Sequence, residues 1–224
     1  MIIGALGSAT GKRYQENYDV AHLGADIAVV ADGMGAGPGS EMAGRTAVDL
    51  VVAAARTPDA VVAAVAVAHE RLIAFGDEHE VLAGCTLTAV FEAGDALWVA
   101  HIGDSRLYRL RGELLELLTV DHTMAWLGAV HGWYPFESRE AKRARYHLTR
   151  CVGDPRRPTP DLLRLDTAPG DVLLLCTDGV AEQVDYHRIA RTLAGSPQAA
   201  VADLLAAADA AGGNDNATAV VLRF

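Results

Sequence analysis

The sequence contains few cysteines, and none of them are spaced as zinc ligands. Cys85, Cys151 and Cys176 are the three in 224 residues, and no two form a Cys-x-x-Cys pair. Neither a disulfide framework nor a thiolate zinc site is therefore indicated. Because so few and so scattered thiols are typical of a reducing compartment, we expect a cytoplasmic protein.

Long hydrophobic runs and an excess of positive charge are also lacking. The longest uncharged apolar run, 60–68, is much shorter than the ~20 residues of a membrane span. The first residues place apolar side chains before basic ones, which is the reverse of a secretory signal. The net charge of -10 disfavours nucleic acid and anionic lipid as partners. We expect a protein that binds neither nucleic acid nor membrane.

No internal repeat, low-complexity tract or Pro/Ser-rich linker divides the chain. With 51% hydrophobic and 21% charged residues, the composition is that of a folded globular protein. A length of 224 residues is enough for one substantial domain and rather short for two. We therefore expect residues 1–224 to form a single domain. A monomer is our separate expectation, which length and composition do not establish.

Short apolar runs predict strands, and longer alanine-rich stretches predict helices. The strands are expected at 27–31, 86–91, 97–102, 106–110, 162–165, 172–176 and 217–224, and the helices at 41–56, 59–75 and 198–210. Turns at Gly94 and Gly112 predict two hairpins. Hairpin-joined strands with grouped helices favour antiparallel sheets coated by helices over a doubly wound parallel sheet.

Four aspartates stand at the ends of these strands, each beside a glycine or another turn-forming residue. They are Asp32, Asp104, Asp178 and Asp215. Each one alone is an ordinary strand-ending residue. If four strand ends meet at one place, however, repulsion between the carboxylates favours a bound cation. Oxygen ligands without His or Cys suit Mg²⁺ or Mn²⁺ better than zinc.

Four motifs, ADGMG, GDSRLY, CTDGV and GNDNATAVV, follow one another in this order along the chain. They resemble the signature blocks of the bacterial metal-dependent PPM (PP2C-type) protein serine/threonine phosphatases. ENYDV at 16–20, LTVDHT and HLTRCVG resemble further blocks of that family. The resemblance implies an α+β fold, a four-layer αββα sandwich in which two central antiparallel β-sheets are flanked by helices.

The resemblance also implies a set of metal ligands in a cleft at one end of the sandwich. Asp32 would bridge two Mn²⁺ or Mg²⁺ ions, and the Gly33 carbonyl would bind one of them. Asp178 and Asp215 would complete the shell of the other ion, and Asp19 would hold metal-bound water.

A third, weaker ion is also implied by the resemblance. Its ligands would be Asp104 and, less directly matched, Glu182.

The chain departs from the resembled family at two places. Met34 stands where many members have a histidine that can protonate the leaving serine oxygen, and methionine cannot do so. Tyr14 occupies the position at which the family has a phosphate-binding arginine, and the nearest arginine in this chain, Arg13, lies one residue earlier. We expect Arg13 to reach the phosphate through a small bulge, the alternative being a solvated arginine.

The implied activity is hydrolysis of phosphoserine and phosphothreonine in proteins, opposed by a cognate serine/threonine kinase. Direct attack by an activated water needs no covalent phosphoenzyme, so none of the cysteines need be a nucleophile. Two alternatives stay open: a catalytically silent module that binds a phosphoprotein or a kinase, and a phosphatase for a small phosphate ester. The retained Asp32, Asp178 and Asp215 argue against the silent module.

The segment 139–157 carries seven basic residues against two acidic ones, opposite in sign to the whole chain. In the resembled family this region overlaps a flap beside the cleft. One interpretation is that it attracts acidic phosphopeptides; the other is a solvated basic helix face. His101, inside a predicted strand, is expected to be a packed core residue and not a ligand.

Overall fold

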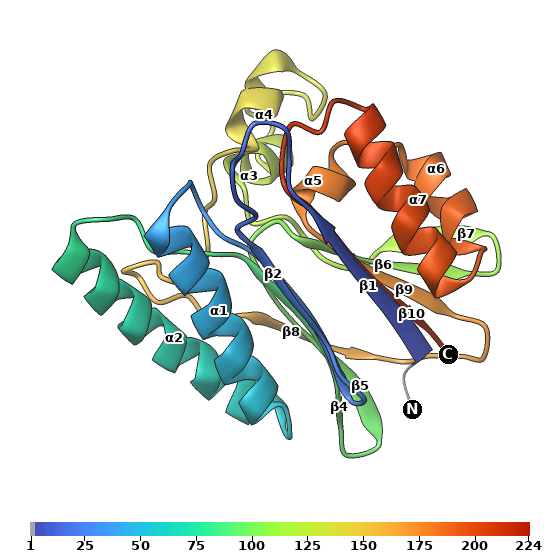
Figure 1. The fold of residues 1–224 in the computed structure, drawn as a ribbon, viewed down its shortest axis with the longest axis horizontal. Coiled ribbons are helices and arrows are strands. Elements are labelled where there is room, and N and C mark those ends of the chain that lie inside the picture. Colours follow the sequence, from blue (N-terminus) through green and yellow to red (C-terminus); the bar gives the residue numbers. More distant parts are fainter. Residues whose placement is uncertain (1–2) are drawn as a thin grey trace.

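The computed structural model describes residues 3–224, which form two five-stranded antiparallel sheets (Figure 1). The first sheet has the order β1 (Ile3–Ala9), β10 (Ala217–Arg223), β9 (Val172–Cys176), β6 (Arg106–Arg111) and β7 (Leu114–Leu117). The second has the order β2 (Asp19–Leu23), β3 (Ile27–Asp32), β4 (Leu87–Ala93), β5 (Ala96–Ile102) and β8 (Asp161–Leu165).

Helices cover the outer face of each sheet, as Figure 1 shows. The second sheet is covered by α1 (Pro38–Ala54) and α2 (Pro58–His79), and the first by α5 (Asp178–Ala181), α6 (Tyr186–Leu193) and α7 (Pro197–Ala210). Two further helices, α3 (Met124–Val130) and α4 (Arg139–Ala144), lie at one end of the sandwich, the upper end in Figure 1. No helix within residues 3–224 has the length and apolar character needed to cross a membrane.

Buried side chains within residues 3–224 form one layer between the sheets and one beneath each group of helices. Alternation along β3 explains the division, because Val29 faces α1 and α2 whereas Ala28 and Val30 face the other sheet. Along β9, Leu173 and Leu175 meet them from the opposite side. Since both faces are buried, these strands are continuous apolar runs in the sequence. The predicted four-layer αββα sandwich is confirmed.

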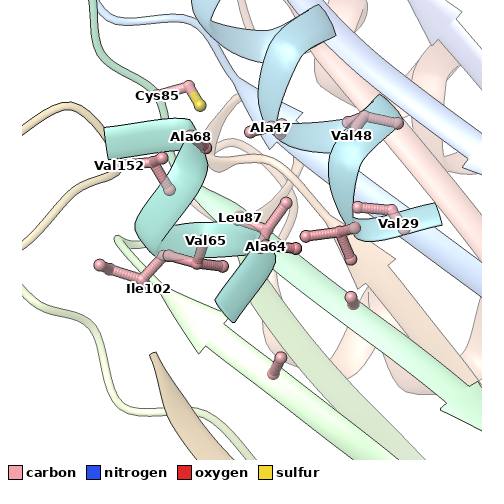
Figure 2. Close-up of a cluster of buried hydrophobic side chains, with 14 of the residues drawn as sticks. Val29, Ala47, Val48, Ala64, Val65, Ala68, Cys85, Leu87, Ile102 and Val152 are labelled. Atoms are coloured by element: carbon pink, nitrogen blue, oxygen red, sulfur yellow. The ribbon is translucent and has the colours of Figure 1, made fainter. Parts of the chain in front are cut away.

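Figure 2 shows the layer beneath α1 and α2. Small side chains on the helices, such as Ala47 and Ala68, let the backbones approach the strands, and Leu87 and Ile102 fill the space between them. α2 begins at a cap in which the Thr57 hydroxyl accepts a hydrogen bond from the Ala60 N–H.

Each of the seven predicted strands and three predicted helices is present, with ends that coincide with the predicted ones or differ by up to four residues. The sequence did not predict β1, β2 or the short helices α3 to α6. β1 is rich in small residues, and Gly7 lies so close to α7 that a Cβ there would be 2.5 Å from the Val201 side chain. Its strand conformation depends on pairing with β10 and not on its own composition. His101 is buried as predicted, between the Thr88 hydroxyl and the Val120 carbonyl.

Candidate metal centre

The fold brings the strand-end aspartates to one end of the sandwich, the upper end in Figure 1. Asp19 begins β2 and pairs in register with Asp32, the last residue of β3. On the other sheet, Asp178 lies two residues after the end of β9, and Asp215 lies two residues before the start of β10, the neighbour of β9. Asp104 lies in the turn between β5 and β6. Antiparallel pairing therefore puts starts and ends of different strands at the same edge.

A cavity of about 300 Å³ lies among these residues. Five of the predicted ligands are in its lining: Asp32, Gly33, Asp104, Asp178 and Asp215. Arg13 and Glu182 line an adjoining cavity of about 180 Å³, which shares Asp178 and Asp215 with the first. Asp19 is part of neither lining and lies half-buried beside Asp32.

Hydroxyl groups that the sequence did not single out hold two of the aspartates. The Asp32 N–H donates to the Thr86 hydroxyl at 2.9 Å, and the Thr86 N–H donates to the Asp32 carbonyl at 2.9 Å. Thr177 and Thr218 both donate to Oδ2 of Asp19, at 2.8 and 2.7 Å. These bonds thus fix the backbone of Asp32 and the carboxylate of Asp19 before any ligand binds.

Close approach between the loops requires glycine at two positions of the site. A Cβ on Gly179 would lie 1.9 Å from the Asn216 carbonyl oxygen, and one on Gly33 would lie 2.6 Å from the Ser40 carbonyl oxygen. The glycine beside Asp178 therefore lets the loop that carries Asp215 approach it. This is the structural reason for Gly in the CTDG motif.

Burial raises the pKa of every aspartate in the cluster, and neighbouring carboxylates raise it further for all of them except Asp215. The pKa of Asp32 lies well above its usual range because of burial and then the charges of Asp19 and Asp178. Burial raises the pKa of Asp19 to about 6, against the lowering effect of the donated hydrogen bonds. For Asp104, burial and then Asp121 raise the pKa to about 7. Ionising these groups together is costly unless a cation is bound.

The donor set fits divalent cations that prefer oxygen. Two buried oxygens, Oδ1 of Asp19 and Oδ1 of Asp178, have no hydrogen-bond partner in the described part of the chain. A buried carboxylate oxygen without a partner is costly, and a cation would satisfy it. No group of three or more His, Cys, Asp or Glu side chains within residues 3–224 could hold a metal ion by itself. Mg²⁺-like ions retain waters and bind through one or two carboxylates, so they do not require such a group.

Glu182 differs from the aspartates because it already has a cationic partner. Its carboxylate lies 3.9 Å from the Arg145 guanidinium, which is placed over the Phe136 ring at 5.4 Å. Burial raises the pKa of Glu182, and Arg145 opposes the rise. A cation shared by Asp104 and Glu182 would compete with Arg145 for this carboxylate.

The protein phosphatase 2C family pattern matches residues 4–210. The chain belongs to this family. It is 33% identical over 230 residues to the serine/threonine protein phosphatase PstP of Mycobacterium tuberculosis. That match covers 97% of this chain but only 44% of PstP, so the chain spans less than half the length of PstP.

Solved phosphatase structures of the same fold cover almost the whole chain. The PPM Ser-Thr phosphatase MsPP from Mycobacterium smegmatis, in complex with cacodylate, has a TM-score of 0.89 at 32% identity, covering 99% of this chain and 98% of MsPP. The catalytic domain of PstP in complex with two manganese ions has a TM-score of 0.88 at 28% identity, covering 99% and 97%. The resemblance seen in the sequence motifs is confirmed.

The raised pKa of Asp104 predicts how stability depends on pH. An unfolded aspartate titrates near pH 4, whereas burial raises the pKa of Asp104 to about 7 in the folded protein. Its contribution to stability is therefore present below about pH 4 and is lost as the pH rises through 7. We predict that Asp104→Asn raises the melting temperature of the metal-free protein, relative to the parent, by several degrees more at pH 8 than at pH 5.

Scanning calorimetry of both proteins in a chelator tests this prediction. The comparison cancels the opposite contribution of the buried histidines, whose pKa values burial lowers. An equal difference between the two proteins at both pH values would contradict it.

Proposed function

We propose that this protein is a metal-dependent serine/threonine protein phosphatase, which hydrolyses phosphoserine and phosphothreonine in proteins. The observation that carries the proposal is the cavity in which Asp32, Asp178 and Asp215 meet, with an unpartnered buried oxygen on Asp178. Membership of the 2C family supports it, as does the similarity to PstP. Protein phosphatase PhpP of Streptococcus pneumoniae is also 29% identical, over 92% of this chain.

We propose Mn²⁺ or Mg²⁺ as the cofactor. Asp32 and the Gly33 carbonyl, with Asp178 and Asp215, would hold two ions, and Asp104 with Glu182 would hold a third. When bound, such ions supply an activated water for in-line attack and offset the negative charge of the phosphoryl group. The two manganese ions in the PstP catalytic domain support the pair.

The chain's own residues would orient the reactants. Thr177 and Thr218 occupy one oxygen of Asp19 and leave Oδ1 for a water. Arg13, on the wall of the adjoining cavity, would bind a phosphoryl oxygen. Met34 lines the main cavity and cannot donate a proton, so the proton for the leaving oxygen would come from water.

We further propose that residues 1–224 are one catalytic domain, acting as a cytoplasmic monomer opposite a serine/threonine kinase. The described cysteines, Cys85, Cys151 and Cys176, are all free thiols, as suits a reducing compartment. The solved relatives, which match over nearly the whole chain, support a single domain.

The first test is hydrolysis of a phosphothreonine peptide. We predict turnover that requires Mn²⁺ and that Asp178→Asn lowers by about 100-fold or more, because the substitution removes a charged ligand at almost constant shape. An unchanged melting temperature of the metal-free variant serves as the control for folding.

Two results would contradict the proposal in different ways. A folded, Mn²⁺-loaded protein without turnover would favour the silent binding module. Faster turnover of a small phosphate ester than of the peptide would favour the small-ester phosphatase.

In the basic segment 139–157, some of the positively charged side chains form ion pairs and others do not. Arg150, Arg156 and Arg157 form ion pairs with Asp161, Asp154 and Glu70. The exposed α4 residues Arg139, Lys142 and Arg143 take part in none of the ion pairs found within residues 3–224. We propose that these α4 residues attract acidic phosphopeptides toward the nearby cavity.

Charge reversal on α4 tests this. We predict that Lys142→Glu with Arg143→Glu raises KM for an acidic phosphopeptide several-fold at low salt, and that the effect fades at high salt. Arg188→Glu with Arg191→Glu, two exposed reversals on α6, is the control matched in charge and should leave KM unchanged. Equal KM values for parent and variant at low salt would contradict the proposal that α4 attracts acidic phosphopeptides.

A further inference from the structure

An apolar groove of about 220 Å³ opens beside the main cavity. One wall is the loop of residues 34–40, which leads from β3 into α1, and the other is Val81 with Leu82, just after α2. Met34, Gly35 and Leu82 line both the groove and the main cavity. The groove is therefore continuous with the space in which the aspartates meet, and a peptide that leaves the cavity on this side passes through it.

Backbone contacts hold the groove in shape. The Met34 N–H donates to the Gly84 carbonyl at 2.9 Å, and the Ser40 hydroxyl donates to the Met34 carbonyl at 2.7 Å. A Cβ on Gly39 would lie 2.0 Å from the Leu82 carbonyl oxygen, so the chain that leaves α2 runs directly against the start of α1 (Figure 1). The two walls are thus fixed to each other, and the groove is formed before any ligand binds.

Glycine keeps the groove open. Gly35 and Gly37 have φ angles of +85° and +128°, which side chains disfavour. A Cβ on Gly37 would have no heavy atom within 4 Å. Since neither residue has a side chain to fill this space, bare backbone forms part of the surface that a ligand would contact.

The groove offers apolar surface without charge. Leu82 is 65% exposed and Val81 is 38% exposed. Within the described residues, its lining contains no Asp, Glu, Lys, Arg or His, and Glu41, just beyond it, is paired with Arg45 at 3.0 Å. Exposed apolar side chains at the rim of a concave site are typical of a binding surface. The acidic main cavity and the uncharged groove therefore suit different parts of one ligand.

We propose that the groove receives an apolar side chain of the phosphoprotein substrate, one or two residues away from the phosphorylated serine or threonine. The proposal rests on the proposed function, which places the phosphoryl group in the main cavity. An extended chain advances about 3.3–3.6 Å per residue. Because the two spaces adjoin at Leu82, a neighbouring residue reaches the groove while the phosphoresidue stays beside the aspartates. Leu82 is thus a specificity-determining residue.

A series of phosphothreonine peptides tests the proposal. In an alanine background, leucine, asparagine or lysine is placed singly at each of the two positions before and the two positions after the phosphothreonine. Leucine and asparagine are similar in size and both uncharged, so long-range attraction does not distinguish them. At one position we expect kcat/KM to be about tenfold higher for leucine than for asparagine.

Leu82→Glu assigns that preference to the groove. The variant should reverse the order of the leucine and lysine peptides at the favoured position, because a glutamate there would attract the lysine. A general change in activity cancels in the ratio of the two peptides, and the exposure of Leu82 makes misfolding of the variant no concern. Leu114→Glu, at a 62% exposed leucine on β7, is the matched control and should keep the ratio of the parent.

Three results would count against the proposal. Equal kcat/KM for leucine and asparagine at all four positions would overturn it and leave the proposed function standing. A leucine preference that persists in Leu82→Glu would also overturn it alone, because another surface would then select leucine. A protein that hydrolyses none of these phosphopeptides would overturn the proposal and the proposed function together.

Discussion

Repulsion among enclosed carboxylates is the constraint on which the rest of this structure depends. Asp32 and Asp178 sit where burial and neighbouring charges raise the pKa of both. A chain that holds such groups together loses stability unless a cation neutralises them. The positions of these carboxylates must therefore be fixed by the fold and not by their own interactions. The Thr86 hydroxyl holds the Asp32 backbone, and Thr177 and Thr218 hold the carboxylate of the neighbouring Asp19. The close approach at Gly179 sets the position of the backbone beside Asp178.

The sandwich provides the rigid frame for this arrangement. Each sheet is buried on both faces along its central strands, so β3 and β9 cannot shift register without disrupting the packing of two layers at once. Their ends project Asp32 and Asp178 from opposite sheets toward one cavity. The site thus joins the two halves of the fold, and a cation there would bridge both sheets.

The strands and the main aspartates could be predicted from the sequence because both have local signals, whereas the four-layer arrangement followed from the family resemblance of the motifs. Continuous apolar runs marked the buried strands, and a carboxylate beside glycine marked where Asp32 and Asp178 end them. Other features carry no such signal. β1 depends on long-range pairing, and α3 to α6 are too short for a clear helical period. The contacts of Thr218 with Asp19 and of Gly11 with Asp215 join the two ends of the chain and become visible only in three dimensions.

The measurement that tests the account most directly is anomalous X-ray scattering from crystals of the protein grown with Mn²⁺. The account predicts two anomalous peaks in the cavity, with Asp32 contacting both ions and with Asp178 and Asp215 on one of them. Saturating Mn²⁺ without a peak in this cavity would contradict it, because the enclosed carboxylates would then be neutralised by protons and not by metal.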